Sequence, residues 1–227
     1  MYRNILFDLD NTLLDFNKAE EDALSLVLLG LGVEPARELI GLYSRINLSQ
    51  WKRLELGELT LEETKVNRFR LFFEELGLDA SPQRATAEFE ELLHGGFYTV
   101  CGARELLRDL YGSFRMYIAS NGTASVQRSR IKGADIADFF DGVFISQELG
   151  AKKPDAEFFE KCFRAIPDFA GEETLIVGDS LTSDIRGGIN SGIDTVWYNP
   201  MGRDKEENVM PVYEISRLED LKAVLNK

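Results

Sequence analysis

The chain has 227 residues, enough for one or two domains with a sizeable hydrophobic core. Its 39 acidic and 26 basic residues give a formal net charge of −13, which argues against nucleic-acid or acidic-membrane binding because no basic field recruits phosphate backbones. The sequence lacks a signal-peptide pattern and any run of roughly 20 apolar residues, and Cys101 and Cys162 imply no disulfide framework, so we expect a cytoplasmic protein.

The first predicted strand is the apolar run Ile5–Phe7, and it ends in Asp8-Leu9-Asp10-Asn11-Thr12. Side chains alternate along an extended chain, so Asp8 and Asp10 can face the same side. Two carboxylates held that close raise each other's pKa unless a cation lies between them or one stays protonated. The pair therefore indicates a metal site, or an ionised nucleophile beside a protonated acid. The plain alternative is a strand that runs into an acidic turn.

Residues 16–95 differ from the rest of the chain because they show helical periodicity and no convincing strand. Gly77 is typical of a helix end, and Ser81-Pro82 of a helix start. The predicted helices are Ala19–Leu31, Ala36–Leu56, Leu61–Leu76 and Pro82–Leu93. We expect this stretch to form a helical insertion with chain crossings near Asp15 and Gly95-Gly96.

One face of the second predicted helix carries Tyr43, Asn47 and Trp51 at positions i, i+4 and i+8. In one interpretation the two aromatic residues belong to the core of the insertion and Asn47 is solvated. In the other, the three side chains form a stacking and hydrogen-bonding surface for a planar base. The sequence leaves both interpretations open.

The remaining chain alternates between apolar runs and amphipathic stretches. The predicted strands are Met116–Ala119, Val143–Ile145, Thr174–Val177 and Thr195–Tyr198, and the predicted helices are Ala103–Tyr111, Ala124–Ile131, Ala156–Ile166 and Ser183–Asn190. Such alternation predicts an α/β fold with a doubly wound parallel sheet. Gly187-Gly188 lies inside the last of these helices and is therefore interpreted as a close-packing site, not a phosphate loop.

Polar residues follow the predicted strands where each one ends. Ser120 and Asn121 follow the second strand, Lys153 comes shortly after the third, and Asp179 follows the fourth. Asp184 lies on the next helix. Ligands of open parallel sheets bind beyond the carboxyl ends of the strands, so we expect these groups to meet Asp8 and Asp10 at one rim. His94 is the only histidine, which argues against a histidine nucleophile or a histidine-rich zinc site.

Taken together, these segments resemble the haloacid dehalogenase superfamily of aspartate-nucleophile phosphohydrolases. Its four motifs occur in order: Asp8-x-Asp10-x-Thr12, then Ser120, then Lys153 in Lys-Pro-Asp, then Gly178-Asp179 with Asp184. The resemblance implies a Rossmann-like catalytic core formed by residues 1–15 and 96–227. It also implies that residues 16–95 are an α-helical cap, which would close over the strand ends and exclude water.

The resemblance assigns a two-step hydrolysis to the motif residues. Asp8 attacks phosphorus and forms an aspartyl-phosphate. Asp10 protonates the leaving oxygen and then deprotonates the attacking water. Lys153 and Ser120 bind the phosphoryl oxygens, and the backbone N–H groups of Asn121 and Gly122 suit the same anion.

A phosphoryl group and several carboxylates cannot share a pocket without cations, and Mg²⁺ fits as a hard, oxygen-seeking ion. The resemblance implies that the side chains of Asp8 and Asp179 and the backbone carbonyl of Asp10 bind the metal. Asp184 is expected to position Lys153 or a bound water. Spacing to Pro154 favours Lys153 over Lys152 as the inward lysine.

Several segments look more closely like the bacterial pyrimidine 5′-nucleotidases, which dephosphorylate deoxyuridine, uridine and thymidine monophosphates. They are Asp10–Phe16, Ile46-Asn47 with Trp51, Ile118–Gly122, Gly178–Gly188, Trp197–Pro200 and Pro211–Ile215. Ser120 stands where that group often has threonine, and both residues carry the needed hydroxyl.

Other functions share these motifs. A sugar-phosphate or phosphoglycolate-type phosphatase would keep every catalytic residue and differ in the cap. A mutase would need cap groups that exclude water, and a dehalogenase would have no use for Asp10 and Asp179. A non-catalytic, phosphate-responsive binding module is the alternative from a different class. We expect a small phosphorylated metabolite as the partner, whereas the oligomeric state is not indicated.

Overall fold

The computed structural model describes residues 1–205 and 208–226, which divide into two compact units. An α/β unit comprises Met1–Asp15 and Phe97–Lys227, and a helical unit comprises Phe16–Gly96. Within the described residues, no helix is long and apolar enough to cross a bilayer.

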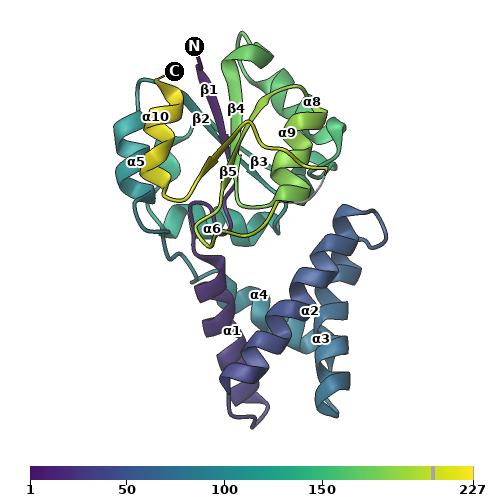
Figure 1. The fold of residues 1–227 in the computed structure, drawn as a ribbon. Helices are drawn as coiled ribbons and strands as arrows, with labels where there is room; N and C mark the ends of the chain where they lie inside the picture. Colours follow the sequence, from purple (N-terminus) through teal and green to yellow (C-terminus); the bar gives the residue numbers. More distant parts are fainter. Residues whose placement is uncertain (206–207, 227) are drawn as a thin grey trace. The chain divides into compact units, whose positions relative to one another are not determined.

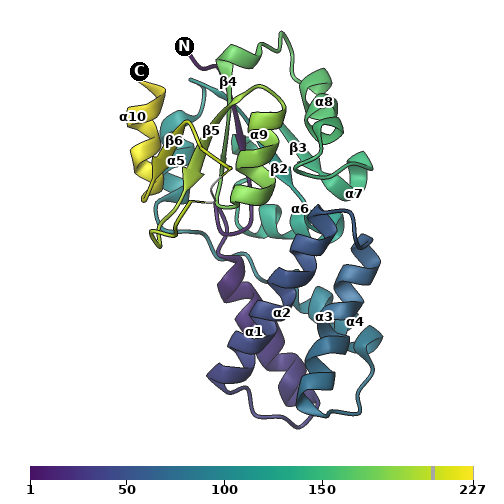
Figure 2. The ribbon, with the colours of Figure 1, turned by 45° about the vertical axis from the view of Figure 1, so that its right-hand side comes forward.

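The α/β unit is built on a parallel sheet that has six strands within the described residues. In space the strands follow the order β3-β2-β1-β4-β5-β6, so β1 lies at the centre between β2 and β4 (Figures 1 and 2). The predicted fold class is confirmed. The strands are β1 (Asn4–Phe7), β2 (Arg115–Ser120), β3 (Gly142–Ile145), β4 (Thr174–Gly178), β5 (Asp194–Tyr198) and β6 (Tyr213–Ile215).

Helices flank the sheet on both faces, which explains why the residues of its central strand β1 are buried on both sides of the sheet. Ile5 and Phe7 of β1 pack into one hydrophobic cluster, and Leu6 packs into another on the opposite face. Figure 1 shows α5 (Ala103–Leu110) and α10 (Leu221–Leu225) on one side of the sheet, and α8 (Ala156–Ala165) and α9 (Arg186–Asn190) on the other. Among the described residues of this unit, the other α-helices are α6 (Ala124–Gly133) and α7 (Ser146–Leu149).

The predicted helix Ser183–Asn190 begins with a π-helical turn, Leu181–Ile185, before α9 follows. Gly187 and Gly188 let α9 approach its neighbours closely. A Cβ at Gly188 would lie 2.5 Å from Thr195 Cγ2, and one at Gly187 would lie 2.4 Å from Phe159 Cε2. The predicted close-packing role of this glycine pair is confirmed.

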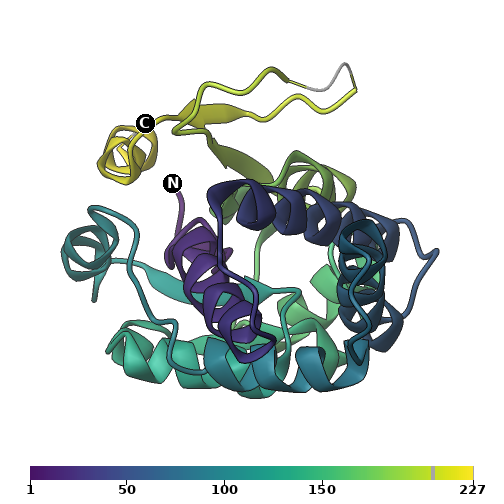
Figure 3. The same ribbon diagram turned by 90° about the horizontal axis from the view of Figure 1, so that it is seen from below.

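The helical unit, all of whose residues are described, consists of α1 (Phe16–Gly30), α2 (Arg37–Glu55), α3 (Leu61–Leu76) and α4 (Pro82–Leu93) (Figure 3). Capping residues mark the start of α3, the end of α3 and the start of α4. Thr60 and Glu63 form a capping box at the start of α3, and Gly77 ends α3 with φ of 62°. Ser81 caps α4 in front of Pro82, so the predicted turn chemistry is confirmed at both positions.

The chain leaves and re-enters the α/β unit through paired segments, which we call the neck (residues 13–15 and 98–100). Leu14 and Thr99 form an antiparallel bridge. On either side, the Asp15 N–H donates to the Tyr98 carbonyl at 2.8 Å and the Val100 N–H donates to the Leu13 carbonyl at 2.9 Å. The neck therefore holds the two ends of the helical insertion side by side.

Gly188→Ala is expected to lower the free energy of unfolding by about 1–3 kcal/mol, because its Cβ would overlap Thr195 and Ile176 in a filled interior. Gly41→Ala in α2 is the matched control. Its Cβ would meet only the Arg45 Nη1 at 3.5 Å, so alanine should stabilise by about 0.5–1 kcal/mol. Urea denaturation measures both, and equal effects would contradict the packing role of Gly188.

Candidate active site

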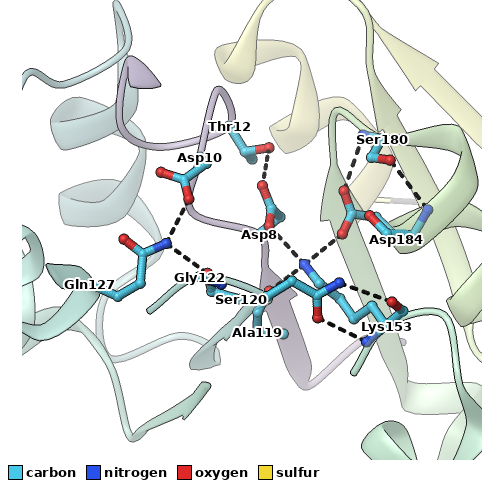
Figure 4. Close-up of polar contacts among 12 residues, drawn as sticks. Asp8, Asp10, Thr12, Ala119, Ser120, Gly122, Gln127, Lys153, Ser180 and Asp184 are labelled. Atoms are coloured by element: carbon cyan, nitrogen blue, oxygen red, sulfur yellow. Dashed lines mark hydrogen bonds and ion pairs between the residues drawn. The ribbon is translucent and has the colours of Figure 1, made fainter. Parts of the chain in front are cut away.

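Asp8 follows the central strand directly, and its carboxylate is held by two donors. One oxygen, Oδ1, accepts a hydrogen bond from Lys153 Nζ at 2.7 Å. The other, Oδ2, accepts from Thr12 Oγ1 at 3.1 Å (Figure 4). The side chain is buried, and its backbone N–H continues the sheet by donating to the Val177 carbonyl. Thr12 of the first motif and Lys153 of the third therefore fix the orientation of this carboxylate together.

Lys153 is completely buried and donates its three protons to three acceptors. They are Asp8 Oδ1 at 2.7 Å, Asp184 Oδ1 at 2.7 Å and the Ala119 carbonyl at 2.5 Å (Figure 4). Burial alone would lower the pKa of Lys153, but the charges of Asp184 and Asp8 overcome it and raise the pKa. The ammonium group therefore stays charged among its carboxylates.

The Asn121 side chain fixes the backbone of Lys153. Its Nδ2 donates to the Lys153 carbonyl, and its Oδ1 accepts from the Lys153 N–H, both at 2.9 Å. Lys152 turns instead to Asp155, with Nζ 2.9 Å from Oδ2. The geometry thus distinguishes the neighbouring lysines, and it gives Asn121 a bracing role that sequence reasoning missed.

Three carboxylates meet beside Lys153. Asp8, Asp179 and Asp184 each offer one oxygen, and these oxygens lie within 4.8 Å of one another. Gly178 makes room for Asp184, because a Cβ there would lie 2.2 Å from its Oδ2. That oxygen also accepts from the Ser180 N–H at 3.1 Å. The expected contact of Asp184 with Lys153 is present, and Asp184 also belongs to the group of three carboxylates that could hold a metal ion.

Burial and the mutual repulsion of these carboxylates raise the pKa values of Asp8 and Asp179. Burial, followed by the charge of Asp184, raises the pKa of Asp8 well above its usual range although Lys153 opposes the shift. Burial and Asp184 also raise the pKa of Asp179 to about 7, against the opposing charge of Arg203. A divalent cation would relieve this repulsion, and the hard oxygen donors suit Mg²⁺.

Asp10 points away from this cluster, toward α6. Its Oδ2 accepts from Gln127 Nε2 at 2.6 Å, and its Oδ1 accepts from Arg130 Nη1. Gln127 Nε2 also lies 2.8 Å from the buried Ser120 Oγ (Figure 4). Ser120 Oγ accepts the Gly122 N–H at 3.2 Å as well. Sequence reasoning missed Gln127 and Arg130, whose only signal was their i, i+3 spacing on the helix that follows Ser120.

In the helical unit, the structure agrees with the interpretation that places Tyr43 in the core of the insertion, so Tyr43 offers no stacking surface for a base. Its side chain is fully buried in an aromatic cluster, with ring centroids 5.0–5.5 Å from Phe69, Phe72 and Phe89. Asn47 is also buried, and it is not solvated: it donates to Glu20 Oε1 at 2.6 Å and accepts from Arg68 at 3.3 Å. Of the three predicted residues on α2, Trp51 keeps a partly exposed side chain.

The chain is similar to known hydrolases along most of its length. Residues 2–192 match the family model of the haloacid dehalogenase-like hydrolases. The pyrimidine 5′-nucleotidase PynA of Streptococcus pneumoniae is 38% identical over 227 residues, which cover 100% of this chain and 96% of PynA. The pyrimidine 5′-nucleotidase YjjG of Escherichia coli is 29% identical, covering 98% and 97% of the two chains.

A solved structure extends the similarity to the whole fold. The crystal structure of the HAD-hydrolase YfnB from Bacillus subtilis matches with a TM-score of 0.95 and 36% identity, covering 100% of this chain and 99% of that one. That structure is described as bound to magnesium and as revealing interdomain movement.

Lys153→Met is expected to lower the free energy of unfolding by about 3–5 kcal/mol at neutral pH in chelator, because it leaves buried carboxylates without their counter-charge. Lys152→Met is the matched control, and loss of its partly exposed pair with Asp155 should cost less than about 1 kcal/mol. Urea denaturation compares the two. Similar losses in both variants would contradict a central role for the Lys153 ammonium.

Proposed function

This chain belongs to the haloacid dehalogenase-like hydrolase family, and we propose that it hydrolyses phosphate monoesters, preferentially pyrimidine nucleoside monophosphates, through an aspartyl-phosphate on Asp8. One observation carries the proposal: Asp8 is oriented by Lys153 and Thr12 beside a group of convergent carboxylates. The family membership inferred from the four motifs is confirmed by the family model and by relatives along the whole chain.

In the first proposed step, the Asp8 carboxylate attacks phosphorus while the bond to the ester oxygen breaks. Asp10 gives its proton to the departing oxygen. The Lys153 ammonium and the Ser120 hydroxyl stabilise the charge that spreads over the phosphoryl oxygens. Lys153 is suited to this role because it is already charged and held by hydrogen bonds to Asp8 and Asp184.

In the second step, water attacks the phosphorus of the aspartyl-phosphate. Asp10 now takes the proton from that water, and the bond between phosphorus and Asp8 breaks. Inorganic phosphate leaves, and the Asp8 carboxylate and protonated Asp10 are restored. A single carboxyl group thus serves as acid and then as base.

Asp8, Asp179 and Asp184, together with the backbone carbonyl of Asp10 that the resemblance implies, are the groups we propose to hold Mg²⁺. When bound, the ion neutralises charge on the phosphoryl oxygens and on the carboxylates. The magnesium-bound structure of YfnB supports this assignment, as does the raised pKa of both Asp8 and Asp179.

The substrate class rests on the named relatives. PynA and YjjG are both pyrimidine 5′-nucleotidases, and PynA aligns with this chain from end to end. We retain Trp51 of α2 as the residue that helps to select a base, since Tyr43 and Asn47 are occupied inside the helical unit. A small phosphorylated metabolite is the proposed partner, and the free thiols Cys101 and Cys162 suit the proposed cytoplasmic location.

Asp8→Asn is expected to reduce phosphate release to background, because asparagine keeps the shape of the side chain but is not an anionic nucleophile. Asp109→Asn, which alters an exposed ion pair with Lys222, is the control and should retain full activity. Circular dichroism checks the fold of both variants. Turnover by pure Asp8→Asn would remove Asp8 as the nucleophile.

Removal of Mg²⁺ with a chelator should abolish phosphate release by the wild-type enzyme, and re-addition of Mg²⁺ should restore it.

A panel of esters tests the substrate class. Deoxyuridine and thymidine monophosphates should give kcat/KM values at least about tenfold above those of purine monophosphates, phosphoglycolate and hexose phosphates, a difference of about 1.4 kcal/mol. Trp51→Ala should lower kcat/KM for nucleotides and leave 4-nitrophenyl phosphate within about twofold, because an aryl ester depends on the core motifs alone. Better turnover of sugar phosphates would limit the assignment to phosphatase.

A further inference from the structure

Helix α6 supplies both side chains that hold the Asp10 carboxylate. Gln127 Nε2 lies 2.6 Å from Oδ2, and Arg130 Nη1 donates to Oδ1. Asp10 keeps 29% of its side chain exposed, whereas Gln127 is 2% exposed and Arg130 is fully buried. A partly exposed carboxylate is thus anchored to the interior of the α/β unit.

Gln127 and Arg130 form one connected network with Ser120. Arg130 Nη1 donates to Gln127 Oε1 at 3.0 Å, and Gln127 Nε2 lies 2.8 Å from Ser120 Oγ. The missing side chain at Gly122 provides the space, since a Cβ there would lie 2.3 Å from Gln127 Nε2. The network therefore couples Asp10 to the hydroxyl assigned to the phosphoryl group.

The helix presents these two residues on one face, as their i, i+3 spacing requires. Ile131 anchors α6 in the hydrophobic core beside them. Arg128 lies on a different face, where it pairs with Glu148 of α7 at 2.6 Å and remains half exposed. Burial of a guanidinium is costly unless its N–H groups find acceptors, and the Asp10 carboxyl group accepts one of them from Arg130. Arg130 thus differs from Arg128 in that it is fully buried and contacts Asp10.

We propose that Gln127 and Arg130 are positioning residues for Asp10 and keep its carboxyl group aligned with the ester oxygen and the attacking water. The inference rests on the proposed function and deepens it. An unrestrained aspartate samples several staggered rotamers, and proton transfer needs donor and acceptor within about 2.6–3.2 Å. Gln127 contacts both Asp10 and Ser120. In the proposed mechanism, this shared contact sets the position of Asp10 relative to the phosphoryl group that Ser120 binds.

Esters with different leaving groups separate positioning of the acid from a general structural role. A good leaving group such as 4-nitrophenolate needs little protonation, whereas an alkoxide needs a well-placed acid. Gln127→Leu, which removes the donors at similar volume, should lower kcat/KM for deoxyuridine monophosphate by about 10²-fold or more. The same variant should lower kcat/KM for 4-nitrophenyl phosphate by less than about tenfold.

Further variants control for folding and charge. Arg130→Met should show the same steep dependence on the leaving group, and Arg130→Lys should recover part of the lost activity because it restores a cation. Arg128→Met on the same helix should behave as wild type toward both esters. Thermal denaturation identifies any variant that does not fold, and Gln127→Leu and Arg130→Lys are the milder changes if Arg130→Met fails.

The outcomes distinguish this proposal from the proposed function. A wild-type protein inactive on every ester overturns the proposed function and, with it, this inference. An active wild type whose Gln127 and Arg130 variants lose both esters equally, or neither, overturns the positioning role alone. A readout without turnover is the Gln127 side-chain amide resonance in the NMR spectrum. It should shift in Asp10→Ala, and an unchanged resonance also overturns the positioning role.

Discussion

A single buried ammonium group organises the candidate active site. Lys153 is enclosed by Asp8, Asp184 and a backbone carbonyl, and these carboxylates repel one another in its absence. The interaction joins segments that follow three different strands, and Asn121 braces it from a fourth. Stability and proposed chemistry are therefore linked, because the charge that balances the buried carboxylates is also the charge assigned to the phosphoryl group.

The sheet order makes this convergence possible. β1 is paired on one side with β2 and on the other with β4, so Phe7 lies level with both Ile118 and Val177. Residues that follow these strands must emerge at one rim of the sheet. Glycines at Gly178 and Gly122 then leave space for the Asp184 and Gln127 side chains. The strand order thus brings the motif residues close together, and the two glycines let the Asp184 and Gln127 side chains pack against the backbone.

Sequence patterns predicted features that depend on nearest neighbours along the chain. Apolar runs that end in polar residues indicated β1 to β5 and the motif residues, but β6 has only three residues and too little pattern to be found. Gln127 and Arg130 escaped notice because their partner Asp10 is more than 100 residues away. The burial of Tyr43 could not be predicted for a different reason. Residues spaced along one face of a helix do not reveal whether that face packs inside the helical unit or contacts solvent.

The neck between Leu13–Asp15 and Tyr98–Val100 has a consequence for the length of the insertion. Its paired segments hold together the two ends of the insertion, the 81 residues between Asp15 and Phe97, through backbone hydrogen bonds that belong to the α/β unit. The entropy of closing such a loop changes only slowly with its length. An insertion of a different length could therefore be closed at this point at a similar entropic cost, because the neck already brings its two ends together.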